Sequence, residues 1–273
     1  MINQIGCNMF QKLVAAVLLV FFSSSGHAGL LNKEGKWYGY YGWNRAEYSN
    51  SDLHLTGNGY DFTLYDVQAT DRPTPTALDP YLNPAGLTLP QSNGRVGYYL
   101  TDTFSVSFGN DHMKYVMVQD QTVAIEGYIN SGSTTYAAGE TIDLADGGFL
   151  TFEHTDGLNF ISFEFEHFLP FWVSEQAEAA LSAYWGLGYA IMYPKTNATL
   201  FGQARNDQFH AAGYGLSIKA GAELLLKYDF FMRIFVKSGQ IEMNDVRTTA
   251  SSADRLSQEF TFLQTAIVFG MNF

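Results

Sequence analysis

The sequence predicts an all-β fold, an eight-stranded antiparallel transmembrane β-barrel of the outer-membrane type. Residues 257–273 alternate large apolar side chains with small or polar ones, which is the period-2 pattern of a strand with two different faces. Aromatic residues make up 16% of the chain and 26 residues are glycine, a mixture typical of aromatic girdles around a crowded barrel interior. Beyond the N-terminus no stretch approaches the roughly eighteen apolar residues of a spanning helix, so if the mature chain spans a membrane, it must do so as a closed barrel.

The first 28 residues have the pattern of a secretory signal peptide. Lys12 precedes an apolar run over residues 13–22, and small residues end the segment. The run is too short to span a bilayer, so we expect cleavage after Ala28 rather than a membrane anchor. Residues 29–273 are then expected to form a single barrel domain.

The first four expected strands are separated by turn or loop signals. Residues 36–44 interleave glycine with tryptophan and tyrosine, and residues 95–100 combine valine, tyrosine and leucine with glycine. A tight Thr-Asp-Thr turn leads into residues 104–113, where phenylalanine and valine alternate with serine. Residues 158–169 alternate phenylalanine with serine and glutamate, so one face is apolar and the other is polar.

The last four expected strands complete an even number. Residues 181–191 follow a short polar turn and combine aromatic and aliphatic residues with glycine. Residues 212–224 alternate leucine and isoleucine with serine and lysine, and residues 230–237 alternate apolar residues with arginine and lysine after a tight Tyr-Asp turn. Residues 257–273 then close the barrel.

The connections between these strands differ in length in a regular way. Long polar segments at about 50–91 and 118–152 are expected to be extracellular loops, and the short turns are expected to face the periplasm. This alternation is what outer-membrane barrels show, and an even strand number leaves both termini on the periplasmic side. The expected location is therefore the outer membrane of a Gram-negative bacterium, with the loops outside the cell.

Strand parity places several charged side chains inside the barrel. Residues 158–169 turn two glutamates inward, and cations enter from three other strands; the set is Arg95, Glu164, Glu166, Lys219 and Arg233. An eight-stranded interior is just wide enough for side chains to fill, and buried charges are costly unless they pair. We therefore interpret this lumen charge network as a structural plug, with a proton or ion path as the alternative.

With a filled lumen, function is expected at the extracellular rim. Asp111 and His112 end one expected strand, and His154 and Asp156 precede its antiparallel neighbour. Their ends lie at the same rim, so these four residues form the candidate catalytic group. Imidazoles and carboxylates can act together as an acid/base pair.

The same rim could hold a metal. His112, His154 and Asp66 would supply two imidazoles and one carboxylate, which suffice for a divalent metal such as Fe(II). In an unbulged strand Asp111 points inward and His112 outward, so a bulge at 109–110 would be needed to bring both inward. The alternative is that the two histidines are rim residues that meet lipopolysaccharide phosphates or water.

In these rim stretches the chain resembles a group of small outer-membrane barrels that includes lipid A oxidase. The resemblance covers roughly residues 36–170 and rests on the aromatic first strand, Tyr60–Thr63 with Asp71–Arg72, Asp111–Lys114, and Phe152–Asn159. It implies oxidation of the proximal glucosamine of lipid A with oxygen and a divalent metal. The C-terminal Phe273 is similar to the assembly signal of outer-membrane proteins, which implies the barrel assembly machinery as a partner.

Two functions from different classes remain open. The first is a protein that acts on or binds lipid A or lipopolysaccharide at its extracellular rim, with a lipid A-modifying, oxidase-like activity. The second is a non-enzymatic structural or adhesive barrel with surface-exposed loops. The formal net charge of −12 leaves no basic surface for nucleic acid, so the expected partners are outer-membrane lipids and lipopolysaccharide.

Overall fold

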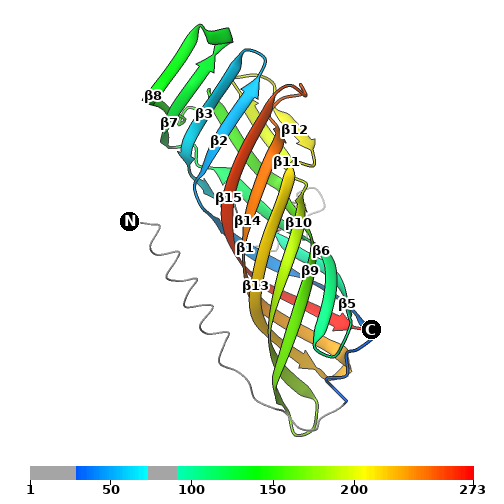
Figure 1. Cartoon of the computed structure of the whole chain (residues 1–273). Coiled ribbons are helices and arrows are strands. Elements are labelled where there is room, and N and C mark those ends of the chain that lie inside the picture. Colours follow the sequence, from blue (N-terminus) through cyan, green and yellow to red (C-terminus); the bar gives the residue numbers. More distant parts are fainter. Residues whose placement is uncertain (1–28, 73–90) are drawn as a thin grey trace, which may run out of the picture.

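The chain folds into one long antiparallel β-barrel in a computed structural model that describes residues 29–72 and 91–273 (Figure 1). The expected signal peptide, residues 1–28, lies outside the described residues. Among the described residues eight strands form a hydrogen-bonded ring. In ring order they are β1 (Trp37–Tyr48), β5 (Ser92–Tyr99), β6 (Phe104–Met117), β9 (Leu150–Val173), β10 (Ala179–Met192), β13 (Gly213–Leu226), β14 (Phe230–Arg247) and β15 (Arg255–Asn272).

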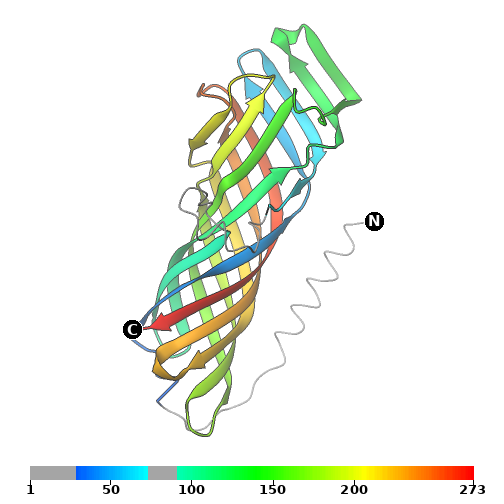
Figure 2. The ribbon, with the colours of Figure 1, turned by 180° about the vertical axis from the view of Figure 1, so that it is seen from behind.

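The ring closes where the first and last strands meet. β1 and β15 pair antiparallel from Tyr38 opposite Asn272 to Tyr48 opposite Phe262. Figure 2 shows the red C-terminal strand beside the blue first strand. The predicted all-β fold with an eight-stranded antiparallel ring is therefore confirmed. No helix in residues 29–72 or 91–273 is long and apolar enough to cross a membrane.

A belt of apolar side chains surrounds the ring on its outer face. Phe108 is 62% exposed, Leu216 is 55% exposed and Phe269 is 51% exposed. Every ring strand contributes to this belt; one member from each is Trp43, Val96, Phe108, Phe165, Leu187, Leu216, Ile234 and Phe269. A continuous exposed apolar band of this kind faces lipid in transmembrane barrels. We call it the lipid belt, and the ring strands span the membrane at its level.

The expected extracellular loops are largely strands, which corrects the prediction. The segment 50–91 contains β2 (Ser51–Gly57), β3 (Tyr60–Val67) and β4 (Ala69–Thr70), although its part 73–90 lies outside the described residues. The segment 118–152 contains β7 (Thr122–Ile129) and β8 (Thr134–Asp143). β11 (Lys195–Leu200) and β12 (Asn206–Phe209) form a further hairpin, and β11 pairs with β9.

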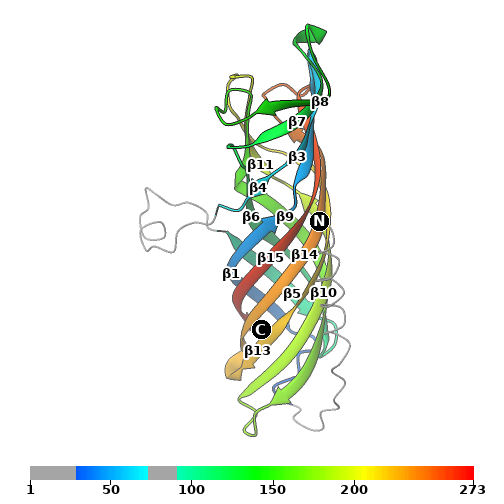
Figure 3. The same cartoon turned by 90° about the vertical axis from the view of Figure 1, so that its left-hand side faces the viewer.

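These added strands continue the barrel wall beyond the lipid belt. The sheet runs from β15 through β2, β3 and β7 to β8, while β4 pairs with β6. We call β2, β3, β7 and β8 the extracellular sheet. Figure 3 shows β3, β7 and β8 at the end of the molecule away from the C-terminus.

The interior is filled from end to end. Near the periplasmic end lies a cluster of aromatic and aliphatic side chains that includes Tyr38, Phe168 and Phe231. Beyond the lipid belt lies a larger apolar cluster, here called the extracellular core, which includes Phe62 and Phe152. The ion pairs around Glu164, described below, lie between the two clusters, whereas the charges of Arg233 and Lys33 lie against rings of the periplasmic cluster.

Candidate functional site

Buried ion pairs close the lumen at the level of the lipid belt. The Glu164 carboxylate lies 2.8 Å from the Arg95 guanidinium and 2.7 Å from the Lys237 ammonium. Lys219 lies 2.6 Å from Glu164 and also pairs with Glu166. All five side chains are buried. Because an unpaired buried charge is costly, these pairings are what allow charges to occupy the lumen.

Arg233 extends this lumen charge network toward the periplasmic end. Its Nε donates to Glu223 at 2.8 Å, and its Nη2 donates to the Tyr99 hydroxyl at 2.8 Å. Lys33, which precedes β1, reaches the same Glu223 carboxylate at 2.5 Å. The described residues thus contribute five cations, Lys33, Arg95, Lys219, Arg233 and Lys237, and four carboxylates, Asp111, Glu164, Glu166 and Glu223.

Two of the four expected catalytic residues point to opposite sides of the barrel wall. Asp111 points into the lumen, where it pairs with Lys237 and accepts a hydrogen bond from Asn93 at 2.9 Å. His112 lies on the outer face of β6, and its Nδ1 is 3.0 Å from the Asn159 side-chain oxygen. The histidine is buried on this face.

His154 belongs to the extracellular core. It is fully buried, its Nδ1 lies 3.1 Å from the Thr196 hydroxyl, and its ring packs against the rings of Tyr115 and Phe152. Its Nε2 lies 3.4 Å from the Gln258 side-chain nitrogen. Burial lowers the pKa of His154 to about 3, so the imidazole is neutral at physiological pH. This histidine is a core residue.

Asp156 and Asp66 lie on the surface. The Asp156 carboxylate pairs with the Lys195 ammonium at 3.0 Å, and this hydrogen bond holds the pKa of Asp156 below its ordinary value. Asp66 accepts a hydrogen bond from Asn50 at 2.9 Å. Within residues 29–72 and 91–273, no three or more histidine, cysteine or acidic side chains are grouped so that they could hold a metal ion. The expected site of His112, His154 and Asp66 is not assembled.

The register of β6 and β9 explains why these residues stay apart. The pairing runs without interruption from Phe104 to Met113, so the strand has no bulge at 109–110. The irregularity lies further along, between Met113 and Tyr115. His154 is opposite Tyr115, three residues beyond His112, or about 10 Å along the strand. Parity turns one imidazole inward and the other outward.

The extracellular sheet has two unlike faces. Its inner face buries Leu53, Phe62 and Ile125 in the extracellular core. Its outer face exposes Tyr65 and Tyr128, which are 37% and 39% exposed. Sequence reasoning missed this surface, although apolar and polar residues alternate along β2, β3 and part of β7.

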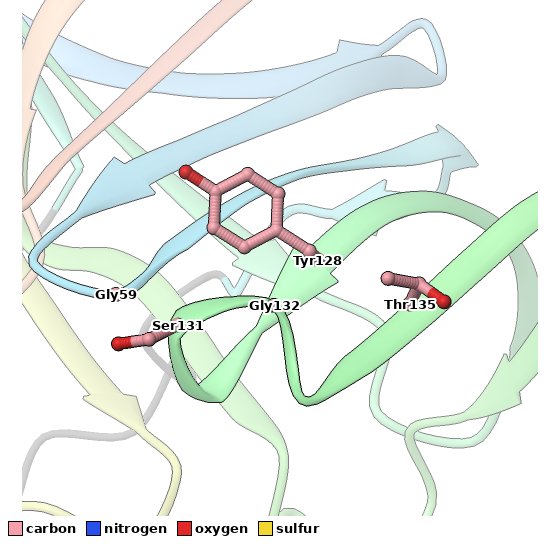
Figure 4. Close-up of a pocket in the computed structure, with 5 residues that line it drawn as sticks. All are labelled: Gly59, Tyr128, Ser131, Gly132 and Thr135. Atoms are coloured by element: carbon pink, nitrogen blue, oxygen red, sulfur yellow. The ribbon is translucent and has the colours of Figure 1, made fainter.

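A pocket of about 450 Å³ opens at the tip of this sheet (Figure 4). It is lined by Gly59, Tyr128, Ser131, Gly132 and Thr135. The backbone N–H of Ser131 donates to the Gly59 carbonyl at 2.7 Å, which ties the β7–β8 turn to the β2–β3 turn. Both glycines have positive φ angles, 91° for Gly59 and 85° for Gly132. Other residues rarely adopt this conformation, so glycine suits both turns.

The fold and its surface define the class of this protein. In the closed antiparallel ring each strand pairs with a neighbour on both sides, so the ring has no open edge at the level of the lipid belt, as a spanning β-protein requires. The protein is an outer-membrane β-barrel of the Gram-negative type, with a filled lumen and a folded extracellular extension.

The chain is similar in fold to several solved structures of bacterial surface and outer-membrane proteins. No protein-family model and no curated protein matches the chain. In structure it is similar to Neisserial surface protein A, with 10% identity, 88% of this chain and 100% of that chain covered, and a TM-score of 0.39. It is also similar to OprG from Pseudomonas aeruginosa, with 9% identity, 89% and 97% covered, and a TM-score of 0.40. A third is Ail of Yersinia pestis, with 9% identity, 86% and 99% covered, and a TM-score of 0.28.

Proposed function

We propose that this protein is a non-enzymatic outer-membrane barrel that presents a folded β-surface to a binding partner outside the cell. One observation carries the proposal: the lumen is filled, while the wall continues past the lipid belt into a sheet anchored by its own apolar core. A packed inner face holds the sheet in place, so its outer face is pre-organised for binding.

The lipid A oxidase expected from sequence resemblance lacks comparable support. That activity would need a metal or an acid/base group at the rim, and the described residues place His112, His154, Asp111 and Asp156 in four different surroundings. The neutral His154 is enclosed in the extracellular core, where a lipid substrate has no access. A binding role uses the surface that the fold does build.

The filled lumen leads to a first testable prediction. We expect the purified protein in a planar lipid bilayer to produce no stepwise ion conductance, because ion pairs around Glu164 and Glu223 occupy the cross-section. A large-pore porin inserted under the same conditions serves as the positive control. Stable open-channel steps would contradict a closed lumen and would favour an ion path through the charge network.

The extracellular tip provides a direct test of the binding function. Replacement of residues 127–138 by an Asn-Gly turn removes the tip but keeps Val123 and Ile125 in the extracellular core. We expect cells that carry this variant to lose attachment to surfaces that the parent binds, at equal amounts of folded barrel in the membrane. The measurement is the number of cells retained under flow.

A periplasmic change is the matched control for this experiment. Replacement of residues 175–177 by Asn-Gly shortens the β9–β10 turn at the opposite end and should leave attachment unchanged. Equal attachment by the tip variant and the parent would contradict the proposal. A change of one oxygen in the mass of lipid A when the protein is removed would support the enzyme instead.

A further inference from the structure

We propose that the pocket at the tip of the extracellular sheet binds a neutral glycan, with the Tyr128 ring as its stacking platform. This inference rests on the proposed binding function and names the chemical class of the partner. A sugar ring has one face of C–H groups and an edge of hydroxyls, so a site for it needs an exposed aromatic face beside hydrogen-bonding groups. The tip supplies both.

The register lines up three suitable side chains in one row across the sheet. Tyr128 of β7 is opposite Asp61 of β3 on one side and opposite Thr135 of β8 on the other. Directly opposed residues point to the same face, and neighbouring strands lie about 4.8 Å apart. The row therefore places a carboxylate, an aromatic ring and a hydroxyl within about 10 Å, a span that matches one or two sugar rings.

The polar groups of this pocket are available to a ligand. Among the described residues, no hydrogen bond within the protein involves the hydroxyls of Tyr128, Ser131 and Thr135. Asp61 does not line the pocket but lies beside it, opposite Tyr128; its carboxylate is about half exposed and accepts a hydrogen bond from His54 at 2.9 Å, so one oxygen stays open to a sugar hydroxyl. Hydroxyl donors and acceptors with one carboxylate suit the alternating donors and acceptors of a sugar edge.

Backbone shape favours close approach at the same point. A Cβ added to Gly132 would meet no atom within 4 Å, so the space over this residue is open. A Cβ added to Gly59 would come to 3.0 Å from the Ser131 hydroxyl and would narrow the pocket. Glycine at both positions leaves room for a ligand against the backbone.

The carboxylates near the Tyr128 ring favour a neutral glycan over an anionic one. Asp61 lies in the row itself, and Glu126 lies two residues from Tyr128 on the same outer face. The whole chain carries a formal net charge of −12. Carboxylates beside the ring disfavour sialylated or sulfated sugars through like-charge repulsion, whereas an uncharged sugar can donate its hydroxyls to Asp61.

The test uses the full chain in lipid nanodiscs and three sets of oligosaccharides. The neutral probes are built from glucose, galactose or N-acetylglucosamine, and the other two sets are sialylated and sulfated. We expect binding to at least one neutral probe and none to the anionic sets. Tyr128→Ala should weaken this binding by about tenfold or more because the stacking face is lost, whereas Tyr128→Phe keeps the ring and should stay within about threefold.

Two further variants test whether the glycan binds at the pocket or elsewhere on the outer face of the sheet. Thr135→Val removes one hydroxyl at nearly constant volume and should weaken neutral-glycan binding. Tyr65→Ala removes the other exposed ring of the outer face, four residues away along the sheet, and should leave binding unchanged.

The outcomes distinguish this inference from the proposed function. Absence of neutral-glycan binding by the parent, binding confined to anionic probes, or equal binding by Tyr128→Ala would each overturn the glycan site. If the tip variant still loses cell attachment in that case, the binding function stands and its partner is a protein surface. Loss of glycan binding in Tyr128→Ala with retention in Tyr128→Phe would support the site.

Discussion

Glu164→Gln is expected to lower the free energy of unfolding by about 3–5 kcal/mol, the cost of leaving buried charges without their partner. The glutamine has the same shape but no charge, so it creates no cavity. Arg95, Lys219 and Lys237 all lie within 2.8 Å of the native carboxylate and would lose it together. Urea unfolding in lipid vesicles, followed by tryptophan fluorescence, measures the change.

Two companion variants make the result specific to the lumen. Glu140→Gln on the exposed strand β8 removes a carboxylate from the surface and should leave the unfolding midpoint unchanged. Lys237→Met added to Glu164→Gln removes one surplus cation, and Arg95 remains 3.7 Å from Asp111, the other partner of Lys237, so part of the loss should be restored. Equal midpoints for Glu164→Gln and Glu140→Gln would show that the lumen charge network is hydrated and does not hold the barrel closed.

Ile267→Arg should destabilise the barrel by about 2–4 kcal/mol, because it places a cation in the lipid-facing band of the membrane. Ile267 lies on the outer face of β15 between Trp43 of β1 and Ile234 of β14, in the middle of the lipid belt. The same urea titration in vesicles reports the change. It also gives the fraction of protein that inserts.

Ser257→Arg is the matched control for this substitution. Ser257 lies on the same strand and has the same parity, but it is opposite His54 in the extracellular sheet. It is therefore beyond the lipid belt, and an arginine there should be tolerated. If the two arginine variants unfold at the same urea concentration, the belt does not face hydrocarbon and the placement of the membrane is wrong.

The filled lumen and the extracellular sheet together explain how the wall is used. Below the rim, the interior side chains are committed to ion pairs and aromatic packing, so they hold the ring closed. Above it, the same strands bury apolar side chains against the extracellular sheet. We therefore expect such a barrel to carry little through its lumen, while its wall holds the extracellular sheet away from the lipid.

The ring strands were predictable because the membrane imposes a strong local pattern on them. Lipid on one side and a crowded lumen on the other force alternation between unlike side chains, as in residues 158–169 and 257–273. The extracellular strands lack this constraint. β8 has no buried residue at all, so no apolar period marks it, and its strand conformation depends on pairing with β7.

The lumen charges could likewise be predicted from the sequence, because the alternation along a strand decides which side chains point inward. Glu164, Arg233 and their neighbours follow from this rule. Lys33 does not, because it lies before the first strand and enters the lumen only through the path of the chain around the barrel end. Its role belongs to tertiary structure.

The sequence by itself determined the class of fold, the membrane, the order of the ring strands and the identity of most lumen charges. Each of these depends on the alternation of apolar and polar side chains along a strand, which can be read directly from the sequence. Only the tertiary structure decided which charges pair, that His112 and His154 face opposite sides of the wall, and that Asp61, Tyr128 and Thr135 share one row. Those relations depend on the register between strands far apart in the chain, and a shift of one residue would exchange inside for outside.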